Sequence, residues 1–229
     1  MKNYTDINII VDRSGSMSSI ATDMLGGLRT FIKTQKERKD QAKVSFYLFD
    51  DQYDTIFQEK DLSDVSDEDF ALIPRGWTAL VDAIGTTINS VGERLSKIAE
   101  ADRPNRVLLL IITDGADNRS REFKLAKVKE MVQHQRDVYA WDFVFLGANI
   151  DSFATGGGLG IVGSSTRDFA PTTKGVREAF IGLNSNYASY SILNREQDRG
   201  STFDWNTAKA EQKAKEEANN AAVPVTQNS

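Results

Sequence analysis

Short apolar runs separated by long amphipathic stretches limit the folds open to this chain more than any other feature. The runs at 6–12 (DINIIVD) and 106–114 (RVLLLIITD) are apolar on both faces, as in strands that are covered on both sides of a sheet. A third run of this kind covers 139–147. The run at 106–114 is the most strongly apolar, so it is predicted to be the central strand.

Helices are predicted between these strands. Apolar residues recur every three or four positions over 20–39 and 78–98, which places them on one face of a helix. Further helices are predicted over 123–135 and 174–193, with a short one from Asp151, and a last strand lies within 161–169. The segment 43–58 predicts two strands joined by a tight turn.

This alternation predicts a doubly wound α/β domain. Strands joined by helices of this length form a mostly parallel central sheet with helices on both faces. The strand at 53–58 follows a tight turn, so it is expected to run antiparallel at one edge. With 229 residues, one domain is expected over 1–197. The polar segment 198–229 is predicted to be a tail, either a frayed helix or disordered, because from Ala208 it has almost no large apolar residues.

Composition excludes several classes of function. The chain has no cysteine and a single histidine, His134, which rules out disulfides, thiolate nucleophiles and histidine-cluster metal sites. Lys and Arg total 28 against 33 Asp and Glu, so the basic excess of a nucleic-acid binder is missing. No apolar run approaches the roughly 18 residues of a membrane span, and the first residues do not resemble a signal peptide. We therefore expect a cytoplasmic protein with no membrane or nucleic-acid partner.

Polar residues cluster where the predicted strands end. Asp12-Arg13-Ser14-Gly15-Ser16 follows the first strand, Thr113-Asp114-Gly115 follows the central strand, and Gly76-Trp77-Thr78 precedes the second long helix. In a doubly wound sheet the loops after the first and central strands are neighbours at the switch point. Together they offer two carboxylates and three hydroxyls, from Asp12, Ser14, Ser16, Thr78 and Asp114. These hard oxygen donors suit Mg²⁺ or Mn²⁺, with Ca²⁺ as an alternative.

The motif D-x-S-x-S, a Thr that opens a later helix, and an Asp that ends a central strand resemble the von Willebrand factor A domain. The strings TALVDAIG and LLLIITDG are also similar to this family, so the resemblance covers roughly residues 5 to 195. It is closest in character to small stand-alone members from bacteria and their phages. The resemblance implies a Rossmann-like fold with a metal-ion-dependent adhesion site (MIDAS) formed by Asp12, Ser14, Ser16, Thr78 and Asp114.

What the resemblance implies for function is protein binding without catalysis. Asp12 and the two serines would bind the ion directly, while Thr78 and Asp114 would bind directly or through water. An open coordination position would accept an Asp or Glu carboxylate of a partner protein. The resemblance also implies possible partners, among them AAA+ ATPases and components of stress-response or tellurite-resistance systems.

Three alternatives stay open at this point. Asp12 and Ser14 could cap the first helix, with Asp114 as a turn residue. Asp12 could be the nucleophile of a metal-dependent phosphohydrolase, but Ser14 stands where a second acid is needed and the segments at the site offer no Lys. Gly158, Gly160 and Gly163 form a literal G-x-G-x-x-G, the dinucleotide fingerprint. They lie far from the end of the preceding strand, which favours a short helix from Asp151 that ends at these glycines.

Overall fold

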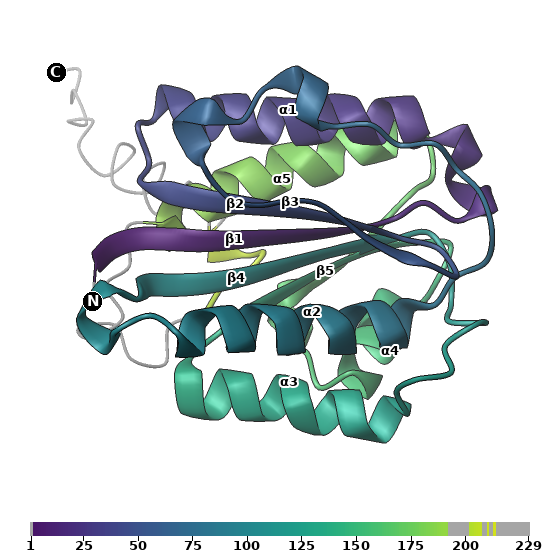
Figure 1. The fold of residues 1–229 in the computed structure, drawn as a ribbon. Helices are drawn as coiled ribbons and strands as arrows, with labels where there is room; N and C mark the ends of the chain where they lie inside the picture. Colours follow the sequence, from purple (N-terminus) through teal and green to yellow (C-terminus); the bar gives the residue numbers. More distant parts are fainter. Residues whose placement is uncertain (1, 192–201, 208–209, 211–212, 214–229) are drawn as a thin grey trace, which may run out of the picture.

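The computed structural model describes residues 2–191, 202–207, 210 and 213 as one layered α/β domain (Figure 1). A six-stranded sheet has the order β3-β2-β1-β4-β5-β6. The strands are β1 (Lys2–Asp12), β2 (Ala42–Phe49), β3 (Tyr53–Asp61), β4 (Pro104–Thr113), β5 (Asp142–Ala148) and β6 (Thr166–Phe169). The α-helices are α1 (Ala21–Glu37), α2 (Leu80–Ser96), α3 (Leu125–Tyr139), α4 (Ser152–Gly158) and α5 (Thr173–Ser191).

The sheet topology confirms the predicted fold class. β1 pairs in parallel with β2 on one side and with β4 on the other, and β5 and β6 continue the parallel sheet. Only β3 is antiparallel, paired with β2 at the edge. Helices α1 and α5 cover one face of the sheet, and α2 and α3 cover the other (Figure 1). The chain passes from β1 through α1 to β2 on one side, and later from β3 through α2 to β4 on the other side of β1. The switch point therefore lies between β1 and β4.

The strand β4 is the centre of the core, as its apolar sequence predicted. All ten of its residues are buried. Leu108, Leu110 and Ile112 pack in the cluster that includes residues of α1 and α5. Their neighbours along the strand, at 107, 109 and 111, pack in the cluster that includes residues of α2 and α3. This alternation with a period of two fixes the register of the central strand against its neighbours. It therefore also fixes where along the sheet β4 ends.

Two predicted boundaries near β5 are wrong. The helix expected to end at Gln135 continues to Tyr139, and the strand expected from Tyr139 begins at Asp142. Ala140 caps the end of this helix with a left-handed φ of 53°, and the chain then turns into the strand. The last strand is also shorter than the range 161–169, because residues 163–165 form a single 3₁₀ turn.

Part of the predicted tail packs on the domain. Phe203 and Trp205 are buried in the same cluster as α1 and α5. The Phe203 N–H donates to Asp142 Oδ1 at 3.2 Å, and the Trp205 N–H donates to the Ser164 carbonyl at 3.0 Å. Most of 198–229 lies outside the described residues, so a frayed or disordered tail stays a prediction there. None of the helices in the described part of the chain is long and apolar enough to cross a membrane.

We predict that Phe203→Ala lowers the free energy of unfolding by about 3–5 kcal/mol, the range for a buried Phe. Phe203 is fully buried, whereas the control residue Phe153 is 68% exposed, so Phe153→Ala should have little effect. Urea unfolding followed by circular dichroism measures both. Equal small effects of the two substitutions would show that residues 202–207 do not pack on the domain.

Candidate metal centre

Asp12 is placed by the strand that it ends. It is the last residue of β1 and is fully buried beside the end of β4. The Ser14 N–H donates to Asp12 Oδ1 at 2.6 Å, and the Thr113 hydroxyl donates to Asp12 Oδ2 at 2.6 Å. Each carboxylate oxygen therefore accepts at least one hydrogen bond from the protein, which fixes the orientation of the group.

The other four predicted residues gather around Asp12. Ser14 Oγ lies 3.0 Å from Ser16 Oγ, and the Ser16 hydroxyl donates to Asp114 Oδ1 at 2.7 Å, although these two residues are 98 positions apart. A methyl group built on Gly115 would lie 3.4 Å from Thr78 Oγ1 and 3.9 Å from Ser16 Oγ. The structure thus brings together the oxygen atoms of Asp12, Ser14, Ser16, Thr78 and Asp114 at one edge of the sheet.

The two carboxyl groups lack a compensating positive charge. Burial raises the pKa of Asp12 to about 6, against the hydrogen bonds from Thr113 and Ser14 that lower it, and the charge of Asp114 raises it further. Burial also raises the pKa of Asp114. Neither carboxylate forms an ion pair with any Lys, Arg or His that the structure describes. A divalent cation among these five oxygen donors would offset the cost of burying both charges.

Arg13 follows Asp12 in sequence but turns away from the cluster. Its guanidinium pairs with Asp50 (Nε to Oδ2, 3.3 Å) and with Asp54 (Nη2 to Oδ2, 2.6 Å). Arg75 Nε lies 2.7 Å from the same Asp50 Oδ2. Because Asp50 is buried and shared by two arginines, it ties the loop after β1 to the segment that leads to Thr78.

Backbone hydrogen bonds strengthen this tie. The Arg75 N–H donates to the Arg13 carbonyl at 2.7 Å, and the Gly15 N–H donates to the Gly76 carbonyl at 3.3 Å. Gly76 has a left-handed φ of 68°, and a Cβ there would lie 2.3 Å from Asp51 Oδ1. The left-handed backbone and the contact with Asp51 both favour glycine at this position.

A second set of hydrogen bonds joins the start of α2 to the loop after Asp114. The Thr78 N–H donates to Asn118 Oδ1 at 2.9 Å, and the N–H groups of Asn118 and Arg119 donate to the Thr78 carbonyl. The Asp82 carboxylate accepts the three backbone N–H groups of residues 121–123, at 2.7–3.0 Å. Thr78 and Asp114 therefore belong to one connected piece of structure.

Sequence reasoning missed three residues that support this site. Thr113 lies in the segment that holds Asp114, Asp50 lies in the segment 43–58 with its predicted tight turn, and Asp82 lies in the string TALVDAIG, but no pattern in the sequence assigns any of them a role at the site. The one available signal was position: Thr113 directly precedes the predicted ligand at the end of the central strand. His134 is exposed on α3, where its ring lies against Tyr139, so it takes no part in the site.

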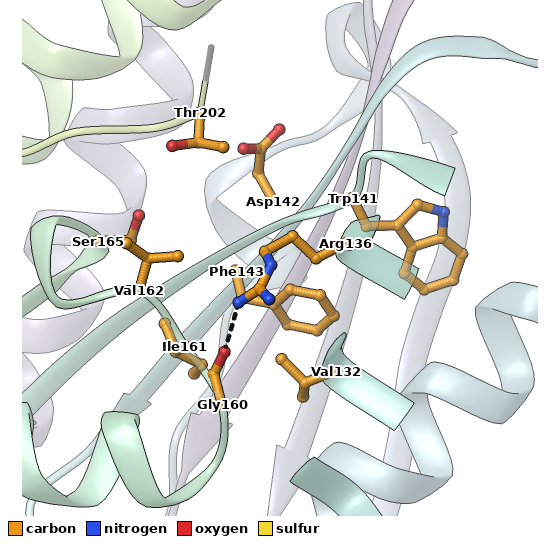
Figure 2. Close-up of a pocket in the computed structure, with 10 residues that line it drawn as sticks. All are labelled: Val132, Arg136, Trp141, Asp142, Phe143, Gly160, Ile161, Val162, Ser165 and Thr202. Atoms are coloured by element: carbon orange, nitrogen blue, oxygen red, sulfur yellow. Dashed lines mark hydrogen bonds between the residues drawn. The ribbon is translucent and has the colours of Figure 1, made fainter. Parts of the chain in front are cut away.

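The glycine motif does not form a dinucleotide site. Gly158 ends α4, Gly160 has a φ of 82°, and Gly163 opens a 3₁₀ turn. No helix follows until α5, so the strand–turn–helix arrangement of that fingerprint is missing here. The predicted short helix is confirmed, because Asp151 caps α4 by accepting the Ala154 N–H at 2.8 Å. Figure 2 shows the Gly160 carbonyl accepting a hydrogen bond from Arg136 (2.9 Å) at the edge of a small pocket.

Comparison with solved structures defines the fold. No family model and no curated protein matches the chain. The von Willebrand factor type A protein from Catenulispora acidiphila aligns with 80% of this chain and 42% of its own, at 15% identity and a TM-score of 0.58. The von Willebrand factor domain of the type V pili tip protein Mfa5 from Porphyromonas gingivalis aligns with 83% of this chain and 97% of its own, at 9% identity and a TM-score of 0.60. The chain has the fold of a von Willebrand factor A domain.

One similar structure contains a metal-occupied MIDAS motif. Proximal thread matrix protein 1 from the mussel byssus, solved with a zinc-occupied MIDAS motif, is 14% identical with a TM-score of 0.57. The alignment covers 79% of this chain and 45% of that one, so this chain spans less than half the length of the matrix protein. These similar proteins come from a byssus and a pilus tip, and they give no support to the expected cytoplasmic location.

We predict that Asp82→Ala lowers the free energy of unfolding by about 1.5–3 kcal/mol, because three backbone N–H groups lose a charged acceptor. Glu93→Ala on the same helix is the control, since the Glu93 side chain is exposed and pairs with the exposed Lys97, and it should change stability little. Hydrogen exchange should also show faster exchange of the amides of residues 121–123 in Asp82→Ala. Unchanged exchange would contradict the hydrogen bonds from these three amides to the Asp82 carboxylate.

Proposed function

We propose that this chain is a divalent-cation-dependent protein-binding module. Asp12, Ser14 and Ser16 bind the ion directly, and Thr78 and Asp114 bind it directly or through water. One coordination position stays open for an Asp or Glu carboxylate of a partner protein. The observation that carries the proposal is the cluster of two buried carboxylates and three hydroxyls, in which neither carboxylate pairs with a Lys, Arg or His among the described residues.

The donor set favours a hard metal ion. Mg²⁺ takes six oxygen ligands and usually keeps several waters, and Mn²⁺ accepts the same ligands. Five side chains cannot fill six positions, and only two of them carry charge, so the bound ion keeps enough positive character to attract a third carboxylate. Ca²⁺ is an alternative. The zinc in the byssus protein supports a divalent ion at this kind of site and leaves the choice of metal to experiment.

Catalysis is not part of the proposal. Phosphoryl-transfer enzymes with an Asp nucleophile at the end of the first strand usually have a second acid two residues later, where this chain has Ser14, and they need a general acid–base pair. Asp12 contacts neither a Lys nor a His in the described part of the chain. The names of the similar proteins, a pilus tip protein and a thread matrix protein, also fit binding rather than turnover. AAA+ ATPases and stress-response or tellurite-resistance proteins are the partner classes to try first.

We expect Mg²⁺ or Mn²⁺ to raise the melting temperature of chelator-stripped protein. An ion at about 100 times its dissociation constant stabilises the folded state by about 2.7 kcal/mol. The double variant Ser14→Ala, Ser16→Ala should lose this response. Ser19→Ala, an exposed serine in the same turn, should keep it. No shift in the native protein at millimolar metal would contradict the proposed site.

We also predict that metal affinity falls with pH between 7 and 5. The pKa of Asp12 in the metal-free fold is raised to about 6 by burial, and the ion displaces the proton. Below pH 6 metal and proton therefore compete, and affinity at pH 5 should be about tenfold weaker than at pH 7. Calorimetric titration with Mg²⁺ at both pH values measures this. Equal affinities would mean that Asp12 does not bind the ion.

A further inference from the structure

Trp77 is exposed directly beside the proposed cation site. It precedes the predicted ligand Thr78, and 60% of its surface is accessible. The other two tryptophans of the protein, Trp141 and Trp205, are 4% and 5% exposed. A large aromatic side chain left in solvent at a functional edge is unusual, because burial of its surface would stabilise the fold.

The backbone around Trp77 is held on both sides. Before it, the Gly76 carbonyl accepts the Gly15 N–H from the loop after β1. After it, the Thr78 carbonyl accepts the N–H groups of Asn118 and Arg119 from the loop after β4. Trp77 therefore lies between the two loops that carry the predicted ligands, at a position that both of them fix.

The loop after β4 carries two exposed arginines. Arg119 and Arg121 are exposed, and neither side chain forms an ion pair or side-chain hydrogen bond with any residue that the structure describes. The neighbouring acid Asp117 already accepts the Val81 N–H and contacts Ser120. Asp51 lies close to Gly76, and the exposed acid Glu122 follows Arg121, so both signs of charge occur around Trp77. Arg13 and Arg75 are paired with Asp50 and Asp54, whereas Arg119 and Arg121 have no ion-pair partner among the described residues.

We propose that Trp77 and Arg119 form a recognition rim that selects the partner of the cation site. The partner is a protein segment in which an apolar side chain adjoins the metal-binding Asp or Glu, with further acidic residues on the side of Arg119 and Arg121. The apolar side chain packs on the Trp77 ring, and the additional acids pair with the free arginines. Trp and Arg are the residue types that most often dominate binding energy at protein interfaces. This inference rests on the proposed function, because the metal supplies the anchor.

A peptide selection tests the inference with the full chain. A random dodecapeptide display library is bound to the immobilised protein in Mg²⁺ and released with EDTA. We expect the released peptides to contain Asp or Glu next to an apolar residue, with a second acid nearby. Trp77→Ala should bind the best peptide at least tenfold more weakly, while its melting-temperature shift with Mg²⁺ equals that of the native protein. Tyr139→Ala, which removes an exposed aromatic ring at the end of α3, should bind the peptide normally.

A double-mutant cycle separates direct contact from general damage. Replacing the apolar residue of the peptide by Gly should weaken binding to the native protein about as much as Trp77→Ala does, and should cost little more when both changes are combined. Additive losses of affinity in this cycle would contradict the recognition rim but not the cation site. Selection of acidic peptides that have no apolar residue beside the acid would do the same. If EDTA releases no enriched peptide, the proposed function itself fails, and the rim fails with it.

Discussion

Burial of the Asp12 carboxylate without a cationic partner is the constraint on which the rest of the site depends. Moving a charged carboxylate out of water costs free energy unless it is paired, and here the donors from Ser14 and Thr113 are neutral groups. Burial raises the pKa of Asp12 to about 6, the direction expected when the charged form is disfavoured. The sheet causes this burial, because the parallel strands β1 and β4 end side by side and the polar residues at and after their ends lie at the same edge.

Two connected pieces of structure meet at this edge. One is the loop after β1, which Asp50 and its two arginines tie to the segment before Thr78. The other is the start of α2 joined to the loop after β4 by Asn118 and Asp82. The Ser16–Asp114 hydrogen bond is a side-chain contact between them. A cation bound to Ser16 and Asp114 would replace this hydrogen bond, because both side-chain oxygens would then coordinate the same ion. Trp77 lies where the two pieces join, so the same hydrogen bonds that assemble the site also place the proposed recognition rim.

The sequence can predict the site residues that lie at the ends of strands or directly follow them. The spacing D-x-S-x-S and the apolar run before Asp114 fix where two parallel strands stop, and that alone brings Asp12, Ser14, Ser16 and Asp114 together. Asp50 and Asp82 could not be found in this way, because their partners lie in other loops and depend on how closely those loops approach. Phe203 and Trp205 were missed for another reason: two apolar residues in a polar stretch show no periodicity, and only packing against β5 and α5 reveals them. The end of α3 was misplaced because a left-handed Ala140 gives no signal of the kind that Gly gives.

The central claim is that this oxygen cluster holds a divalent ion with a position open to a carboxylate. Water-proton relaxation with Mn²⁺ tests it most directly, because a bound Mn²⁺ that keeps an exchangeable water strongly enhances the relaxation rate. We predict one Mn²⁺ per chain with enhanced relaxation, a fall in that enhancement when acetate is added, and loss of binding in Asp12→Asn. Absence of bound Mn²⁺ at millimolar concentration, or an enhancement that acetate leaves unchanged, would contradict the account.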